Sequence, residues 1–207
     1  AVKNYYARFL ETFPDIAALA AAEQDQVNKC WEGLGYYSRA ANLRKAAQTI
    51  QEQYGGVFPR TWEEVRGLAG VGDYTAGAVC SICYGLPTPA VDGNVLRVAA
   101  RVMNHFCEID RPEQKAAVTA LLRQVYLDNP EHCGTLTQAF MEIGATVCVP
   151  NGQPHCEACP LSELCLGRQY CDALRLPQRT AKKARRQEQY TVFVLQCDGK
   201  FALRKRT

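Results

Sequence analysis

The feature that most limits how this chain can fold is its content of eleven cysteines. Because the number is odd, disulfides within the chain cannot pair all of them. The sequence also starts without the basic and apolar stretches of a secretion signal. A reducing compartment and metal ligation are therefore favoured over a disulfide framework.

Four cysteines fall within one short segment with the spacing C-x7-C-x2-C-x5-C: Cys148, Cys156, Cys159 and Cys165. Thiolates repel one another unless a cation neutralises them, so this cluster predicts a metal centre. Both a tetrahedral zinc ion and a 4Fe–4S cluster take four thiolates. Zinc sites often use two closely spaced cysteine pairs, and this segment has one such pair, which favours the iron–sulfur cluster.

The other cysteines have a simpler interpretation. Cys80 and Cys83 form a second C-x2-C pair, but they lie in an apolar helical stretch without a preceding strand. Core packing is therefore expected there rather than a redox role. Free buried thiols are expected at five further positions: Cys30, Cys107, Cys133, Cys171 and Cys197.

The composition, with 47% apolar and 22% charged residues, is that of a globular protein of one or two domains. No apolar run is long enough to span a membrane. The net charge of +3 permits a polyanionic partner without arguing for one. The first residue is Ala1 and not Met, so we expect the natural start to lie upstream.

Helical periodicity dominates from Tyr5 to about Asn129. Thr61 and Glu64 form a capping-box pattern, which predicts a helix start. One later helix has an apolar face with the spacing i, i+3, i+4 and i+7: Val118, Leu121, Leu122 and Val125.

The character of the chain changes near its end. Residues 178–189 are polar and predict a linker, with basic residues that are either solvated or in contact with phosphate: Lys182, Lys183, Arg185 and Arg186. The β-prone run 190–195, the pair Asp198-Gly199 and residues 200–204 predict a hairpin. Because a lone hairpin is marginally stable in water, a second, β-containing domain is expected to begin here.

Three further motifs carry candidate functions. The segment 68–77 contains Gly70 and Gly72 between two helical patterns, and is either a plain turn or a hairpin whose backbone N–H groups bind phosphate. Asp92 precedes an amphipathic run, so it is a helix N-cap, and the capped carboxylate could also stabilise a developing positive charge. The glycine turn around Tyr36 and Arg39 either packs core aromatics or stacks on bases.

Together these motifs resemble the helix-hairpin-helix DNA glycosylases that carry an iron–sulfur cluster. The motif Gly33-Leu-Gly-Tyr-Tyr-Ser-Arg-Ala and the motif Asp92-Gly-Asn-Val resemble the adenine DNA glycosylases rather than endonuclease III. The resemblance covers about residues 5–177. It implies a mainly α, two-lobed fold: a helical barrel lobe over 1–86 and a second helical lobe over 87–177 with the cluster loop at 148–165. Residues 190–207 would begin a Nudix-like β domain, so the chain is expected to be truncated at both ends.

The resemblance also implies roles for individual residues. Asp92 would face the cationic sugar, with Asn94 supporting it. Tyr74 stands where endonuclease III-type enzymes carry a nucleophilic lysine, which implies a monofunctional enzyme. Tyr36 would wedge beside the lesion, and Gln138 would hydrogen-bond the extruded adenine. Gly70 and Gly72 would contact phosphate, and Cys148, Cys156, Cys159 and Cys165 would bind the 4Fe–4S cluster.

The implied reaction is hydrolysis of the N-glycosidic bond of adenine mispaired with 8-oxoguanine or guanine in double-stranded DNA. The implied protein is a monomer in the bacterial cytoplasm, associated with the nucleoid and not with membranes. A non-catalytic module that binds lesions in DNA and a zinc-stabilised helical interaction protein are the alternatives. A glycosylase for thymine or oxidised pyrimidines is disfavoured by Tyr74, by the tyrosine pair in the glycine turn and by the Nudix-like tail.

The sequence departs from the family pattern in three ways. Ala69 replaces the usual proline of the hairpin, and the first cysteine gap has seven residues where the family usually has six. The family's catalytic glutamate and a Gln-Gln-Thr segment lie before the region that starts at Ala1, and Glu11, Glu23 and Glu32 do not occur in that context. We therefore expect the 207 residues alone not to excise adenine, whereas the parent enzyme is expected to be active.

Overall fold

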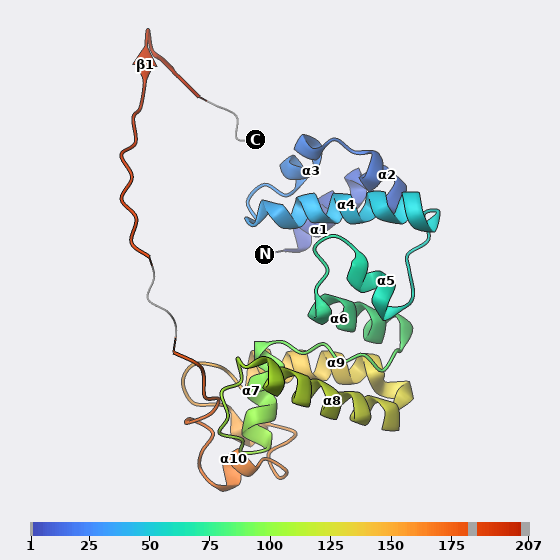
Figure 1. Cartoon of the computed structure of the whole chain (residues 1–207), viewed down its shortest axis with the longest axis vertical. Coiled ribbons are helices and arrows are strands. Elements are labelled where there is room, and N and C mark those ends of the chain that lie inside the picture. The colour runs from blue at the N-terminus through green and yellow to red at the C-terminus, as the bar shows by residue number, and fades with distance from the viewer. Residues whose placement is uncertain (1, 182–185, 204–207) are drawn as a thin grey trace.

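Helices account for nearly all the regular structure in the computed structural model, which describes residues 2–181 and 186–203. The mainly α fold predicted from the sequence is thus confirmed (Figure 1). None of the described helices is both long enough and apolar enough to cross a membrane. The α-helices are α1 (Lys3–Thr12), α2 (Ile16–Ala21), α3 (Gln24–Cys30), α4 (Tyr37–Tyr54), α5 (Trp62–Gly67), α6 (Asp73–Tyr84), α7 (Gly93–Val102), α8 (Pro112–Asp128), α9 (Cys133–Glu142) and α10 (Leu166–Gln169).

Short helical turns and one small sheet complete the described elements. They are the 3-10 helices η1 (Pro130–His132) and η3 (Cys156–Ala158), the π-helix η2 (Ile143–Val147), and the strands β1 (Gln196–Cys197) and β2 (Lys200–Phe201).

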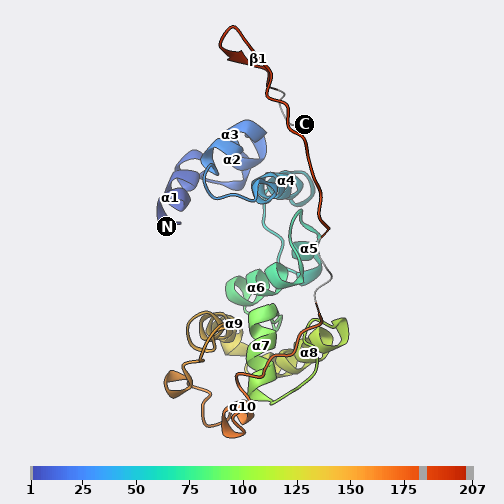
Figure 2. The ribbon, with the colours of Figure 1, turned by 90° about the vertical axis from the view of Figure 1, so that its left-hand side faces the viewer.

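The helices are arranged in two groups with α5 and α6 between them (Figures 1 and 2). α1 to α4 share one apolar core, in which Val27 and Ala40 are fully buried. α7, α8 and α9 share another, which includes Val95 and Tyr126. The predicted lobe boundary near residue 86 lies in the connection between the end of α6 and the start of α7.

Local sequence signals determine where several helices begin. The capping box at α5 is confirmed: Glu64 N donates to Thr61 Oγ1, and Thr61 N donates to Glu64 Oε2, both over 3.3 Å. The predicted apolar face of α8 is only partly correct. Val118 and Leu122 are buried, but Leu121 is 48% exposed. α8 is covered by few other elements, so the buried stripe is narrower than the sequence spacing indicates.

A buried network of hydroxyl groups joins α6 to the second helical group. Ser81 Oγ donates to Gly77 O over 2.7 Å and lies 2.7 Å from Thr137 Oγ1 on α9. Thr137 Oγ1 lies 2.9 Å from the hydroxyl of Tyr126 on α8. Because a buried hydroxyl is costly without a partner, the network fixes how α6, α8 and α9 lie against one another.

The C-terminal part leaves the helical groups as an extended tail (Figure 1). β1 and β2 pair antiparallel around Asp198 and Gly199, whose φ angles of +47° and +72° suit a two-residue hairpin turn. The hairpin is confirmed, but the strand predicted over 190–195 is not observed. These residues are exposed, and among the residues described up to 203, one further bond, from Ala202 N to Leu195 O, extends the pairing.

The predicted linker, residues 178–189, lies partly within the residues that the structure describes. Residues 178–180 still contact the helical body, through a bond from Ile109 N to Gln178 O and one from Thr180 N to Asp110 Oδ2. Arg186 pairs with Glu188. The basic residues predicted at 182, 183 and 185, and the end of the predicted hairpin at 204, lie outside the described residues.

The hydroxyl network generates a stability prediction. Replacing Thr137 with valine keeps the volume but leaves the buried Tyr126 hydroxyl without this partner. We expect Thr137→Val to lower the free energy of unfolding by about 1–3 kcal/mol. The measurement is urea denaturation. Thr119→Val is the matched control, because the Thr119 hydroxyl donates only to Lys115 O in its own helix. An equal loss in both variants would contradict a role for the network.

Candidate functional site

Asp92 lies at the N-terminus of α7 and caps it, as the sequence predicts. Its Oδ1 accepts hydrogen bonds from Asn94 N over 2.8 Å and from Val95 N over 3.0 Å. Its Oδ2 accepts a third, from Asn94 Nδ2, over 2.9 Å. Three donors thus fix the orientation of a half-buried carboxylate, which is a negative charge held ready for a cationic partner.

Tyr74, in the first turn of α6, belongs to the same surroundings. Burial raises the pKa of the Tyr74 phenol, and the negative charge of Asp92 raises it further. The phenol is therefore protonated at neutral pH and lies close enough to Asp92 to feel its charge. The structure brings together Tyr74, Asp92 and Asn94, three residues singled out from the sequence.

Two buried arginines on α7 continue this group into the molecule. Arg97 Nη1 donates to Asn94 Oδ1 over 3.0 Å, while its other nitrogens donate to Cys148 O and Gly144 O over 2.9 and 2.7 Å. Arg101 Nη1 donates to Cys148 Sγ over 3.3 Å. Sequence reasoning missed both arginines. The available signal was a pair of charged residues one turn apart in an otherwise apolar helix.

The four clustered cysteines line one pocket, at the end of α7 that carries Arg101. Burial raises the pKa of the Cys156 thiol, and the neighbouring cysteines at 165, 148 and 159 raise it further. Across the described residues, no three His, Cys, Asp or Glu side chains are placed so that one metal ion could bind them all. Four cysteine side chains nevertheless surround one pocket, a donor set that fits an iron–sulfur cluster, and Arg101 Nη1 donates to one of them, Cys148.

Several other cysteine predictions need correction. Cys80 and Cys133 are buried, and Cys30 and Cys107 are partly buried. The prediction was wrong for Cys83, Cys171 and Cys197, which are exposed. Cys83 lies at the end of α6, Cys171 follows the short α10, and Cys197 is in the tail hairpin. Each of these three positions lies outside the packed apolar cores.

The segment between α5 and α6 forms a tight turn that contains the two predicted glycines. Gly70 has a φ of +75°, and an added Cβ would lie 2.6 Å from the Cβ of Asn42 on α4. Gly72 is the N-cap of α6 and has no such restriction. Arg66 Nη1 donates to Val71 O over 3.0 Å and braces the turn. The turn leaves the exposed glycine backbone at the positive end of α6.

The glycine turn before α4 presents its tyrosines to solvent. Tyr36 is 76% exposed and adopts a left-handed conformation with φ +49°. The Arg39 guanidinium lies 5.0 Å from the centre of its ring. Only Trp31 packs inward, against Phe9, so the alternative that this turn packs core aromatics holds for Trp31 and not for Tyr36. An exposed aromatic in a strained conformation is a candidate for stacking on a base.

Gln138 lies on the exposed surface of α9, directly after the buried Thr137. Its Nε2 donates back to Gly134 O in the same helix over 3.3 Å. The described contacts leave Gln138 on its own helix and do not join it to the Asp92 group.

Comparison with known proteins places this arrangement in a family. A sequence profile described as "HhH-GPD superfamily base excision DNA repair protein" matches residues 1–125, from α1 through most of α8. The chain belongs to the HhH-GPD superfamily of base excision DNA repair proteins. The region matched contains the glycine turn, the hairpin and the capped Asp92, whereas the cysteine loop lies beyond it.

Curated relatives within the superfamily are adenine DNA glycosylases. The protein of Homo sapiens is 43% identical over 81% of this chain and 30% of its own length. That of Schizosaccharomyces pombe is 39% identical over 84% of this chain and 38% of its length. That of Buchnera aphidicola from Acyrthosiphon pisum is 31% identical over 98% of this chain and 57% of its length. The chain therefore spans about a third to somewhat over half of these relatives.

Solved structures of two DNA repair proteins share the fold. A thermostable thymine-DNA glycosylase aligns with a TM-score of 0.72 at 26% identity, covering 82% of this chain and 77% of that one. Endonuclease III in a non-covalent DNA complex aligns with a TM-score of 0.66 at 26% identity, with the same coverage. The likeness extends over most of the helical part of this chain.

The two hairpin glycines differ in a way that experiment can test. We expect Gly70→Ala to lower the unfolding free energy by more than about 1 kcal/mol, because the added Cβ is strained at positive φ and meets Asn42. Gly72→Ala should cost less, since its φ of −95° is open to alanine and its neighbourhood is empty. Thermal unfolding of the two variants checks this. Equal losses would contradict the described turn.

Proposed function

We propose that the parent protein of this chain is a monofunctional adenine DNA glycosylase that hydrolyses the N-glycosidic bond of adenine mispaired with 8-oxoguanine or guanine. The observation that carries the proposal is the Asp92 carboxylate, fixed by three hydrogen bonds at the start of α7 beside the protonated Tyr74. The superfamily match and the adenine-specific names of the relatives support it.

The chemistry follows from the charges. Loss of a base leaves positive charge on the deoxyribose, and a fixed carboxylate stabilises that charge as in glycoside hydrolysis. Asp92 supplies this carboxylate, and Asn94 keeps it from rotating. A lyase reaction through a covalent imine needs an amine. Tyr74 offers a phenol, which supports hydrolysis without strand cleavage.

DNA binding is assigned to exposed turns. Adenine must leave the base stack before it can reach Asp92. Tyr36, with Arg39 over its ring, would fill the gap beside the lesion. The backbone of Gly70 and Gly72 would contact a phosphate, and Gln138 would hydrogen-bond the extruded adenine. The partner is double-stranded DNA that contains the mispair, bound by a monomer.

The cysteine loop is assigned to a 4Fe–4S cluster bound by Cys148, Cys156, Cys159 and Cys165. When bound, the cluster would supply four iron–thiolate bonds that tie the loop 148–165 to itself, while hydrogen bonds of Arg101 link Cys148 and Cys165 to α7. The shared pocket and the hydrogen bond from Arg101 to Cys148 Sγ support this assignment. The tail from residue 190 is assigned to the start of a Nudix-like domain. The exposed apolar run 190–195 supports this, because it needs a sheet to cover it.

The cluster assignment predicts a colour. Freshly purified protein should absorb broadly near about 400 nm, and Cys159→Ser should lose both this band and its bound iron. Cys171→Ser should keep both, because Cys171 is exposed and does not line the pocket. Absorbance spectra with iron and zinc analysis make the measurement. Colourless protein with one bound zinc would contradict the assignment.

Recognition of the mispair can be tested by measuring the affinity of the chain for DNA duplexes. We expect the chain to bind a duplex with adenine opposite 8-oxoguanine about tenfold or more tightly than the matched A:T duplex. Tyr36→Ala should remove most of this preference, because stacking on a base contributes about 1–3 kcal/mol. Tyr6→Ala, an exposed tyrosine on α1, is the matched control. Titration by fluorescence anisotropy gives the affinities, and the absence of any preference in the unsubstituted chain would contradict the proposed function.

The same duplex tests the chemistry. No glutamate of these 207 residues is assigned as the acid that protonates adenine. We therefore predict that the 207 residues bind the mispair without releasing adenine, measured by cleavage of abasic sites with alkali. Release that disappears in Asp92→Asn would contradict this prediction and would support the role of Asp92.

A further inference from the structure

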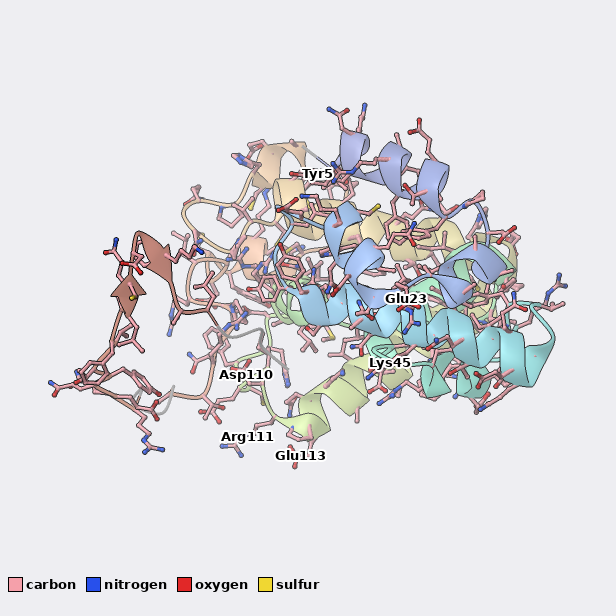
Figure 3. All side chains as sticks on the ribbon, turned by 90° about the horizontal axis from the view of Figure 1, so that it is seen from above. Tyr5, Glu23, Lys45, Asp110, Arg111 and Glu113 are labelled. Carbon is pink, nitrogen blue, oxygen red and sulfur yellow. The ribbon has the colours of Figure 1, made fainter. Side chains whose placement is uncertain are left out.

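Residues 176–180, called the strap here, run along the second helical group before the tail departs. Leu176 is buried, and its carbonyl accepts a hydrogen bond from Arg101 Nε over 2.9 Å. Gln178 O accepts from Ile109 N over 3.0 Å, and Thr180 N donates to Asp110 Oδ2 over 3.2 Å. The strap is therefore held at three points and places its side chains reproducibly. Figure 3 labels Asp110 on the side of the molecule from which the tail extends.

The strap places Arg179 beside the start of α7. Its Nη2 lies 3.8 Å from the position that a Cβ on Gly93 would take, and Gly93 directly follows Asp92. Its Nη1 lies 3.8 Å from Asp110 Oδ1, a long and largely exposed ion pair. Such a pair neutralises little of either charge. A guanidinium half open to solvent thus lies one residue from the carboxylate assigned to the sugar.

The chemistry of a nucleotide explains why this position matters. The deoxyribose that loses its base is joined directly to two phosphates, so a sugar at Asp92 brings a phosphate close to the start of α7. The planar guanidinium of arginine binds phosphate oxygens through paired hydrogen bonds. We propose that Arg179 binds the DNA phosphate next to the nucleotide whose sugar faces Asp92. The inference rests on the proposed function and adds a positioning residue from the segment that follows the helical lobes.

A phosphate-binding role and a purely structural role for Arg179 predict different effects of substitution on DNA affinity. If Arg179 only fastens the strap to Asp110, then Arg179→Gln and Asp110→Asn should lower stability alike and leave DNA affinity unchanged. If Arg179 binds phosphate, Arg179→Gln weakens binding. Asp110→Asn then keeps or strengthens binding, because it removes a competing anion while its side-chain carbonyl still accepts from Thr180 N. The two variants thus separate the two roles.

The experiment measures affinity of the full chain for the duplex with adenine opposite 8-oxoguanine over a range of salt concentrations. Arg179→Gln is expected to weaken binding about tenfold and to reduce the slope of log K against log salt by about 1. Arg123→Gln is the control, since it removes the same charge from the exposed face of α8, which carries no proposed site residue. Unchanged unfolding midpoints show that both variants remain folded.

A modified duplex identifies the phosphate. Replacing the phosphate on one side of the target adenosine with an uncharged methylphosphonate should weaken binding by the unsubstituted chain, but not further weaken Arg179→Gln. If the chain prefers the mispair and Arg179→Gln behaves like Arg123→Gln, this inference is overturned and the proposed function stands. If the unsubstituted chain shows no preference for the mispair, the proposed function fails and the inference fails with it.

Discussion

The positive charge of Arg97 is buried inside the helical body, and the second helical group depends on satisfying it. A buried guanidinium without partners would cost several kcal/mol. Here Asn94, Gly144 and Cys148 all accept from it. These partners come from the start of α7, from η2 and from the first residue of the cysteine loop. The hydrogen bonds of this one guanidinium therefore hold three separate parts of the chain together.

This arrangement explains why Asp92 can serve as a fixed carboxylate. Asn94 donates to Asp92 with its amide nitrogen, and its amide oxygen accepts from Arg97. The amide therefore cannot flip without losing both bonds. Asp92 is in turn bound to two backbone N–H groups of the same helix. The carboxylate is held by the helix it caps and by the core beneath it, and a rigid charge costs little reorganisation when positive charge develops nearby.

Short-range signals could be predicted from the sequence. The capping box at Thr61, the cap at Asp92 and the turn at Asp198-Gly199 depend on neighbours within a few residues, and the structure has all three. Which apolar residues are buried and which segments form strands depends on tertiary packing, which short sequence patterns do not contain. Leu121 has the right spacing for a core face but meets too little of the fold. The apolar run 190–195 predicts a strand, yet a strand needs a partner beyond one short hairpin.

The same distinction applies within the candidate site. Asp92 and Asn94 are close in sequence, so one motif contains both. Tyr74 joins them only because α6 and α7 follow one another around a short connection, and Arg179 joins them only because the strap returns to α7 from far along the chain. Arg97 and Arg101 lie about one turn apart in a largely apolar helix, but charged residues are usually on the surface, so this pattern does not by itself predict their burial.

The residues assigned to chemistry and to DNA contact differ in how they are held. Asp92 and Asn94 are half buried and anchored in a core helix, where small movements are expensive. Tyr36, Gly70 and Gly72 stand on exposed turns, and Arg179 on a strap with an open guanidinium. A glycosylase has to bend DNA and extrude a base, so its DNA contacts must adapt, whereas the charge at the sugar must stay still. The DNA contacts lie on turns and on the strap, and the residues assigned to chemistry lie on α7. One fold thus meets both requirements.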